Sequence, residues 1–173
     1  ATSCVSCEPG EYCSGGASAP VLCTAGTYDD DADPSTACLD CDPGNYCEGG
    51  ITAPESCPEG SVDHDERPET PCTACARGAY CAGGNAPSTP CVFGSWDHDS
   101  SAQTDCVECE TGTFCPGGTT PPTACPPGSW DHDRSAATAC LSCDPGTFCR
   151  GGDTALLTCP EGSWDSDGDT GTP

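Results

Sequence analysis

The chain has 173 residues, including 20 Cys, 22 Gly and 18 Pro, and its formal net charge is −24. Binding to phosphates or to anionic bilayers needs lysine and arginine, and the chain has only four of these residues, which excludes nucleic acid and anionic membrane surfaces as partners. So many cysteines, with only 6% aromatic residues, indicate a secreted protein that uses disulfides in place of an apolar core. No apolar run approaches the roughly 18 residues of a bilayer span, so no membrane span is expected in this segment.

The cysteines divide the chain into tandem repeats. Their spacing, C-x2-C-x5-C-x9-C-x14, gives a period of 34 residues that recurs five times without an insertion or deletion. After Pro173 the next residue in phase would again be a cysteine, so we expect a segment of a longer array. The predicted units are residues 1–3, the tail of a preceding repeat, and then repeats 1 to 5 at 4–37, 38–71, 72–105, 106–139 and 140–173.

Each repeat contains two short stretches that should be extended. The first ends at the third cysteine, as in "GTFC" at 112–115, and the second follows the fourth cysteine, as in "GSWDHD" at 94–99. Pro-Gly and Gly-Gly pairs flank these stretches, and glycine supplies the positive φ that tight turns require. The Tyr, Val or Trp of the second stretch is expected at the junction with the next repeat. The fold class predicted is small and disulfide-rich, with irregular β-hairpins and almost no helix, in an elongated, solenoid-like tandem-repeat rod.

Disulfide pairing is less constrained than the repeat, because four cysteines allow three pairings within a unit. A bridge across C-x2-C would close a tight ring and is the least favoured. We expect first-to-third and second-to-fourth bridges, such as Cys4–Cys13 and Cys7–Cys23 in repeat 1. Each would close a loop of about 10 to 17 residues and contribute roughly 2.5–3 kcal/mol.

The motif C-x2-C-x-x-G-x-[YF]-C-x-G-G, followed by C-P-x-G-[ST]-[WY], resembles the ephrin-receptor-like cysteine-rich repeats of the growth-factor-receptor group. The clearest matches are "CLSCDPGTFCRGG" at Cys140–Gly152 and "CPPGSW" at Cys125–Trp130. The resemblance implies an extracellular module, an elongated rod, no enzymatic activity, and the same first-to-third and second-to-fourth disulfides. The ten bridges expected are Cys4–Cys13, Cys7–Cys23, Cys38–Cys47, Cys41–Cys57, Cys72–Cys81, Cys75–Cys91, Cys106–Cys115, Cys109–Cys125, Cys140–Cys149 and Cys143–Cys159.

An Asp-x-Asp motif recurs in all five repeats, while the other acidic residues do not. The simpler interpretation is a polar turn in which aspartate caps backbone N–H groups. The alternative is a calcium site, because alternating aspartates match the oxygen-rich start of a calcium loop, although the distal glutamate of an EF-hand is missing. The candidate calcium ligands are Asp29, Asp31, Asp63, Asp65, Asp97, Asp99, Asp131, Asp133, Asp165 and Asp167.

The three histidines, His64, His98 and His132, all lie in Asp-His-Asp, but repeats 1 and 5 have Asp30 and Ser166 at this position. A catalytic or zinc role would not tolerate such replacement within one array. Zinc binding by the C-x2-C pairs is not expected either, because single cysteines follow where a zinc ribbon needs a second pair. No nucleophile–base pairing or phosphate loop is present, so no enzymatic activity is expected.

Serine and threonine are abundant near proline, as in "GGTTPPTAC" and "APSTPC". This composition is typical of O-glycosylated secreted surfaces, and the expected attachment sites are Ser88, Thr89, Thr119, Thr120 and Thr123.

The function predicted from these features is structural: an extracellular, secreted or cell-surface protein whose rod forms a surface or matrix fibril. Its expected partners are copies of itself or further repeats of the same chain, with covalently attached glycans and no cofactor other than calcium. Two alternatives remain. One is the stalk of a receptor or adhesion protein, and the other is a calcium-dependent binding rod.

Overall fold

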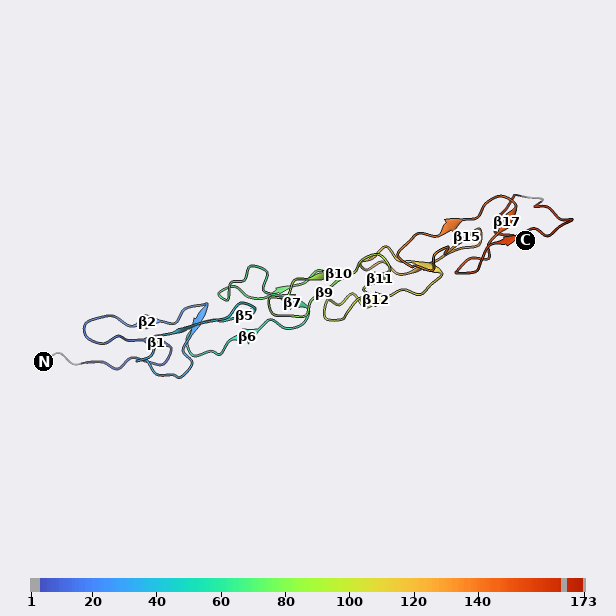
Figure 1. The fold of residues 1–173 in the computed structure, drawn as a ribbon. Coiled ribbons are helices and arrows are strands. Elements are labelled where there is room, and N and C mark those ends of the chain that lie inside the picture. The colour runs from blue at the N-terminus through green and yellow to red at the C-terminus, as the bar shows by residue number, and fades with distance from the viewer. Residues whose placement is uncertain (1–3, 166–167, 173) are drawn as a thin grey trace. The chain divides into compact units, whose positions relative to one another are not determined.

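The computed structural model describes residues 4–165 and 168–172, and in these residues the chain folds entirely into small antiparallel hairpins (Figure 1). All 18 strands are two residues long, and the described residues contain no helix. The predicted fold class of disulfide-rich hairpins is therefore confirmed. None of the described segments forms a helix long and apolar enough to cross a bilayer.

The chain divides into two compact units, the first comprising Ala1–Cys75 and Cys81–Ser88. Its strands pair in chain order as β1–β2, β3–β4, β5–β6 and β7–β8. They are β1 (Glu11–Tyr12), β2 (Val21–Leu22), β3 (Thr27–Tyr28), β4 (Leu39–Asp40), β5 (Asn45–Tyr46), β6 (Glu55–Ser56), β7 (Ser61–Val62) and β8 (Thr73–Ala74).

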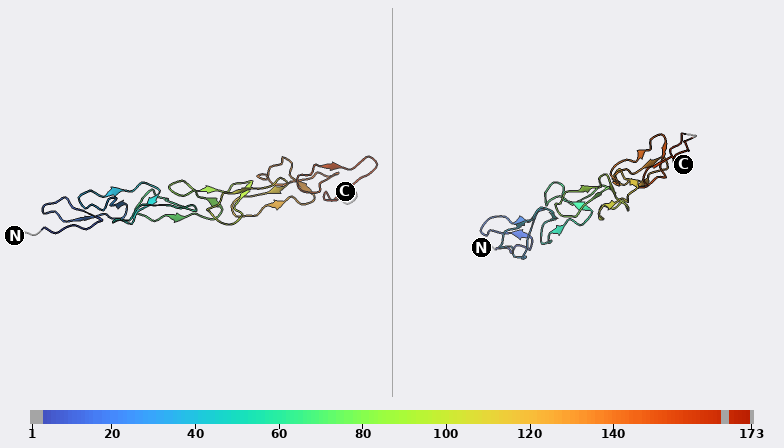
Figure 2. Two further views of the ribbon diagram at one scale, coloured as in Figure 1. Left: turned by 90° about the horizontal axis from the view of Figure 1, so that it is seen from below. Right: turned by 45° about the vertical axis from the view of Figure 1, so that its right-hand side comes forward.

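The second unit comprises Ala76–Tyr80 and Thr89–Pro173. Its strands again pair with their neighbours in sequence, from β9–β10 to β17–β18, and Figure 2 shows these short hairpins from two further sides. They are β9 (Ala79–Tyr80), β10 (Thr89–Pro90), β11 (Ser95–Trp96), β12 (Val107–Glu108), β13 (Thr113–Phe114), β14 (Thr123–Ala124), β15 (Ser129–Trp130), β16 (Leu141–Ser142), β17 (Thr147–Phe148) and β18 (Leu157–Thr158).

Two kinds of hairpin alternate along the chain. The first kind lies within a repeat, and its register places Tyr12 opposite Val21 in β1–β2. The second kind spans the boundary between two repeats, and it places Tyr28 of repeat 1 opposite Leu39 of repeat 2. Trp96 and Trp130 lie in boundary hairpins of the same design, opposite Val107 and Leu141. The prediction that this aromatic position lies at the junction with the next repeat is confirmed.

The disulfides follow the two kinds of hairpin. One type joins the second and third cysteines of a repeat, with a sequence separation of 6, and it staples the turn that leads into the internal hairpin. The other type joins the fourth cysteine to the first cysteine of the next repeat, with a separation of 15. The nine bridges are Cys7–Cys13, Cys23–Cys38, Cys41–Cys47, Cys57–Cys72, Cys75–Cys81, Cys91–Cys106, Cys109–Cys115, Cys125–Cys140 and Cys143–Cys149.

The predicted first-to-third and second-to-fourth pairing is therefore wrong in every repeat. It assumed that each repeat folds on itself, whereas the boundary hairpin β3–β4 brings Cys23 and Cys38 to a Cα–Cα distance of 5.6 Å. The bridges that the structure contradicts are Cys4–Cys13, Cys7–Cys23, Cys38–Cys47, Cys41–Cys57, Cys72–Cys81, Cys75–Cys91, Cys106–Cys115, Cys109–Cys125, Cys140–Cys149 and Cys143–Cys159. Cys4 and Cys159 are free thiols.

The core consists of cysteine. Among the described residues the buried hydrophobic side chains are ten cysteines and Ala136, and the four that are fully buried are Cys47, Cys81, Cys115 and Cys149. Larger apolar side chains lie outside this core, and Leu22 and Phe93, for example, are 64% and 63% exposed. The disulfides therefore occupy the positions that aliphatic side chains fill in an ordinary domain.

Candidate functional site

The Asp-x-Asp motif directly follows the first strand of each boundary hairpin. Its first aspartate is buried in repeats 1 to 4, with exposed fractions of 3–7%. A carboxylate so far from solvent needs hydrogen-bond donors to compensate for its desolvation. The four buried aspartates are Asp29, Asp63, Asp97 and Asp131.

Each buried carboxylate accepts a hydrogen bond from the backbone of the turn that precedes the internal hairpin of the same repeat. The donor is the glycine N–H 19 residues before it, and the N–O distance is 2.8 Å from Gly10 to Asp29 Oδ2. The other three distances are 2.9, 2.9 and 2.8 Å. The first aspartate thus fixes the boundary hairpin to the turn that precedes the internal hairpin.

The second aspartate has a different role on the surface. Asp99 Oδ1 accepts a hydrogen bond from the backbone N–H of Ser101 at 3.0 Å and from the hydroxyl of Thr104 at 2.9 Å. The hydrogen bond from the Thr104 hydroxyl is the main cause of a lowered pKa of Asp99, and the Ser101 N–H and the charge of His98 lower it less. Partial desolvation of the carboxylate opposes this lowering. The pKa of Asp65 and Asp133 is lowered in the same way, first by the hydroxyl five residues on.

These hydrogen bonds confirm the predicted polar turn in which aspartate caps backbone N–H groups. The candidate calcium residues are thus brought together only within each turn, and calcium binding stays a prediction. Asp167 lies outside the described residues, and Asp165 accepts a hydrogen bond from the Gly168 N–H at 2.7 Å.

Repeat 1 differs from the others in one respect that bears on calcium. In repeat 3 the backbone N–H of Ser101 donates to Asp97 Oδ1, but the equivalent oxygen, Asp29 Oδ1, is buried without a hydrogen-bond partner. Carboxylate oxygens of Asp29, Asp30 and Asp31 lie within 4.8 Å of one another. This is the place in the described chain where aspartate oxygens converge with one of them unsatisfied.

The histidines lie on the surface beside the motif. The rings of His98 and Trp96 meet edge to face, with centroids 6.5 Å apart, and His98 Nε2 is 3.8 Å from Asp99 Oδ2. His132 repeats this arrangement with Trp130. The ring of His64 instead shares a hydrogen bond with the Thr73 hydroxyl at 3.0 Å. Their contacts are therefore with the turn and with the boundary hairpin.

The repeat junctions are the second recurrent feature. At each of the four junctions one disulfide, one hairpin and four backbone hydrogen bonds join two repeats. Between repeats 3 and 4 the bonds run from the N–H groups of Gly94, Asp97, Cys109 and Gly118 at 2.8–3.0 Å. Each junction lies within one compact unit, and the same four bonds recur at 2.8–3.0 Å in all of them.

The first glycine of each Gly-Gly pair allows this close approach. A Cβ on Gly117, whose φ is +91°, would lie 2.6 Å from the carbonyl oxygen of Cys91 in the preceding repeat. Gly49, Gly83 and Gly151 would meet the corresponding oxygen at 2.5 Å. These glycines were recognised from sequence as turn residues, but their role as contact points was missed.

The candidate O-glycosylation residues are all exposed, and Thr89 and Thr123 lie in the second strands of internal hairpins. Glycosylation stays a prediction. The candidate sites are Ser88, Thr89, Thr119, Thr120 and Thr123.

Sequence reasoning also missed the threonine that caps the Asp-x-Asp turn. Threonine recurs five residues after the second aspartate in every repeat, and this constant column is a signal that could have identified it. The threonines are Thr36, Thr70, Thr104, Thr138 and Thr172.

No family model and no curated protein matches the chain.

Proposed function

We propose that the chain is a structural protein of the extracellular space, whose repeats form a surface or matrix fibril. The observation that carries the proposal is the fourth-to-first disulfide, because it covalently fastens each repeat to the next in addition to the peptide chain. Such a repeat gains its stability from contacts with its neighbours, which is the design of quasi-one-dimensional arrays.

The chemistry of the chain supports this assignment in two further ways. Nine disulfides form and persist in oxidising compartments such as the extracellular space. A net charge of −24 in 173 residues keeps chains apart unless a specific contact joins them. The resemblance to ephrin-receptor-like repeats and the predicted O-glycans belong to the same proposal, in which glycans add a hydrated coat.

Electron microscopy of native, unreduced material tests the proposal. We expect continuous filaments whose axial period matches one or a few 34-residue repeats, with diffuse density around them where glycans are attached. Short particles that end in a globular head would contradict the fibril and favour the stalk of a receptor or adhesion protein.

Calcium-dependent binding is the second candidate, and the unsatisfied Asp29 Oδ1 beside Asp30 and Asp31 favours it. Oxygen ligands of this kind suit Ca²⁺. Calorimetric titration of the calcium-free chain with CaCl₂ tests it, and Asp30→Asn, which removes one charge from the cluster, should weaken any binding. Heat that is unchanged in Asp30→Asn would contradict a site at this cluster.

A further inference from the structure

Serine or threonine recurs at three positions in at least four of the five repeats. The first position lies in the leading strand of the boundary hairpin, and its hydroxyl donates to the carbonyl three residues before it, as Ser95 does to Val92 at 3.0 Å. The second is the threonine that caps the Asp-x-Asp turn, and the Thr104 hydroxyl donates to Asp99 Oδ1 at 2.9 Å. The same bonds recur in the other repeats from 1 to 4, so the fold uses the hydroxyls of both positions.

The third position lies in the loop of the internal hairpin, and we call it the loop hydroxyl position. Across the part of the chain that the structure describes, none of its hydroxyls takes part in a hydrogen bond, and the side chains that carry them are exposed. Of the three recurrent positions, it alone has hydroxyls that the fold does not use. Its residues are Ser18, Thr52, Thr120 and Thr154, and repeat 3 has Ala86 at this position.

The backbone of the loop hydroxyl position is held firmly although its side chain is free. It follows the Gly-Gly pair, and the N–H groups of Thr52 and Thr120 each donate to the carbonyl of the first glycine at 3.4 Å. The residue before it packs against the preceding repeat, since a Cβ on Gly78 would lie 3.3 Å from the backbone nitrogen of Thr119. The loop therefore presents a hydroxyl to solvent at a fixed place in the hairpin.

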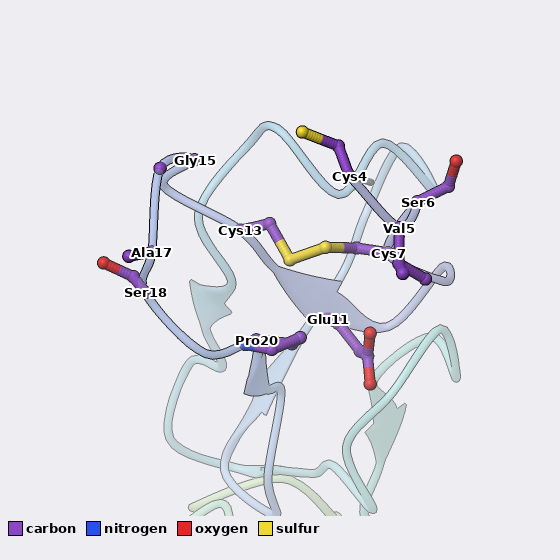
Figure 3. Close-up of a pocket in the computed structure, with 11 residues that line it drawn as sticks. Cys4, Val5, Ser6, Cys7, Glu11, Cys13, Gly15, Ala17, Ser18 and Pro20 are labelled. Carbon is purple, nitrogen blue, oxygen red and sulfur yellow. A yellow bond between two sulfur atoms is a disulfide. The ribbon is translucent and has the colours of Figure 1, made fainter. Parts of the chain in front are cut away.

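Figure 3 shows this loop in repeat 1, where the Ser18 hydroxyl points away from the Cys7–Cys13 bridge. The exposure of Ser18 is not a consequence of where the sequence begins. Thr52, Thr120 and Thr154 each follow an earlier repeat and are exposed as well. The free hydroxyl is therefore a property of the loop in its repeat and not of its place in the chain.

Proline lies close to the loop hydroxyl position in most of the repeats that carry a hydroxyl there. Pro20 and Pro54 follow it by two residues, and Pro121 follows Thr120 directly. Exposed serine and threonine beside proline are typical of O-glycosylated surfaces. In repeat 5 no proline follows Thr154 in the loop, so this residue separates the effect of loop geometry from that of proline.

We propose that Ser18, Thr52, Thr120 and Thr154 each carry an O-linked glycan, so that glycans recur every 34 residues and repeat 3 lacks one at this position. The inference rests on the proposed extracellular function and deepens it by assigning the sites of its glycan coat. Each site lies three residues before the second strand of an internal hairpin, such as β6 or β14. A glycan there stands beside the free edge of a two-stranded sheet, which is otherwise open to pairing with other chains.

The transfer needs an activated sugar, and a nucleoside diphosphate sugar supplies it in the presence of a glycosyltransferase. The hydroxyl oxygen of the serine or threonine attacks the anomeric carbon of the sugar. The bond between this carbon and the diphosphate oxygen breaks, and the diphosphate leaves with the electron pair. The hydroxyl proton passes to a base of the transferase, and nothing is oxidised or reduced.

Site mapping of the native chain by electron-transfer mass spectrometry of its reduced and alkylated peptides tests the proposal. We expect glycans on all four residues of the loop hydroxyl position, with Thr154 modified despite the absence of proline. The hydrogen-bonded hydroxyls of Ser95 and Thr104 should be unmodified. Unmodified Thr52 and Thr120, or equal modification of Ser95 and Thr104, would overturn the assignment.

Variants secreted by the cells that make the native chain test whether the position decides. Thr120→Ala should lose one glycan from the intact mass and still fold, because repeat 3 has alanine there naturally. Ala86→Thr should gain one glycan, since Pro87 follows this position as Pro121 follows Thr120. Thr104→Ala is the matched control and should leave the number of glycans unchanged. An unmodified residue 86 in Ala86→Thr, or an unchanged mass of the glycans in Thr120→Ala, would contradict the proposal.

The mass measurements and the microscopy of native material give separate results. Continuous filaments whose loop hydroxyls are unmodified would overturn the glycan sites and keep the fibril. Glycans at the four loop positions of short particles that end in a globular head would keep the sites and overturn the fibril.

Discussion

The two aspartates of each Asp-x-Asp motif lie two residues apart but in different surroundings. In repeat 3, Asp97 is 4% exposed and accepts N–H groups from Gly78 and Ser101. Asp99 lies on the surface and accepts the hydroxyl of Thr104. Removing a buried acceptor leaves its donors without partners, and this costs more free energy of folding than removing a surface acceptor that water can replace. The first aspartate should therefore govern stability, and the second should govern local titration.

Asp97→Ala should lower the free energy of local opening by about 1–3 kcal/mol, because it leaves the Gly78 N–H buried without an acceptor. Hydrogen exchange of the Gly78 amide measures this loss of protection. Asp105→Ala is the matched control, since Asp105 is an exposed aspartate of the same repeat. Equal protection in the two variants would show that the carboxylate does not hold the turn.

Thr104→Val should raise the pKa of Asp99 towards its ordinary value of 3.8, because the Thr104 hydroxyl is the main cause of the lowered pKa. A carboxyl whose pKa is lowered by folding stabilises the turn above its ordinary pKa, and that contribution is lost as pH falls through the lowered value. The contribution of the Asp99 carboxylate to the turn should thus begin to decline below about pH 3.8. NMR titration of the Asp99 carboxyl carbon measures both effects.

Thr113→Val is the control for this titration. The Thr113 hydroxyl donates to the backbone carbonyl of Glu110 and not to a carboxylate, so its removal should leave the pKa of Asp99 where it is. A shift of similar size in both variants would mean that the hydroxyl acts through the fold and not through its hydrogen bond.

At the residue scale the sequence was sufficient to predict that the motif caps a turn, but not to predict which of its two aspartates is buried. Recurrence in phase predicted that aspartate caps a turn. It could not distinguish Asp97 from Asp99, because burial of the first depends on Gly78, which lies 19 residues earlier. The histidine between them draws attention, yet the contacts of His98 are with Trp96 of the boundary hairpin and with Asp99 of the turn.

At the scale of the hairpin, close approach between successive repeats depends on the absence of a Cβ at glycine. Gly117→Ala should be more destabilising than Gly118→Ala, although both residues have positive φ, +91° and +62°. Both variants incur the left-handed penalty of about 1–2 kcal/mol. Only the first also drives a Cβ to 2.6 Å from the Cys91 carbonyl oxygen.

Exchange protection of the Gly118 amide, which donates to Cys91 O at 2.9 Å, reports on that contact. The amide should lose protection in Gly117→Ala and keep most of it in Gly118→Ala. A greater loss of protection in Gly118→Ala than in Gly117→Ala would show that φ strain, and not the contact with the preceding repeat, determines the loss of stability.

The positions of the hairpins were largely predictable, and their pairing was not. Glycine turns and the aromatic columns located β13 at Thr113–Phe114 and β15 at Ser129–Trp130. Their partner strands, Thr123–Ala124 and Leu141–Ser142, carry no comparable signal, because an exposed edge accepts many side chains. The prediction of the disulfide pairing failed because a repeat counted from its first cysteine does not reveal the hairpin that crosses the boundary between two repeats.

At the scale of the whole chain, covalent bridges take the place of an apolar core. The buried hydrophobic side chains are almost all half-cystines, while larger apolar residues such as Leu22 remain 64% exposed. By the chain-entropy relation, bridges with separations of 6 and 15 residues contribute about 2 and 3 kcal/mol each. Nine of them together exceed the roughly 5–15 kcal/mol of net stability that a folded domain has.

Reduction should therefore unfold the chain completely instead of loosening it. We expect treatment with a phosphine reductant and then iodoacetamide to remove the near-ultraviolet circular dichroism of Trp96 and Trp130 and to collapse the dispersion of amide NMR signals. Iodoacetamide alone is the control, because it reaches only the free thiols Cys4 and Cys159 and should leave both spectra unchanged. If dispersed signals survived full reduction, the hairpins and buried aspartates would maintain the fold without disulfides. The bridges would then serve only to prevent unfolding under mechanical load.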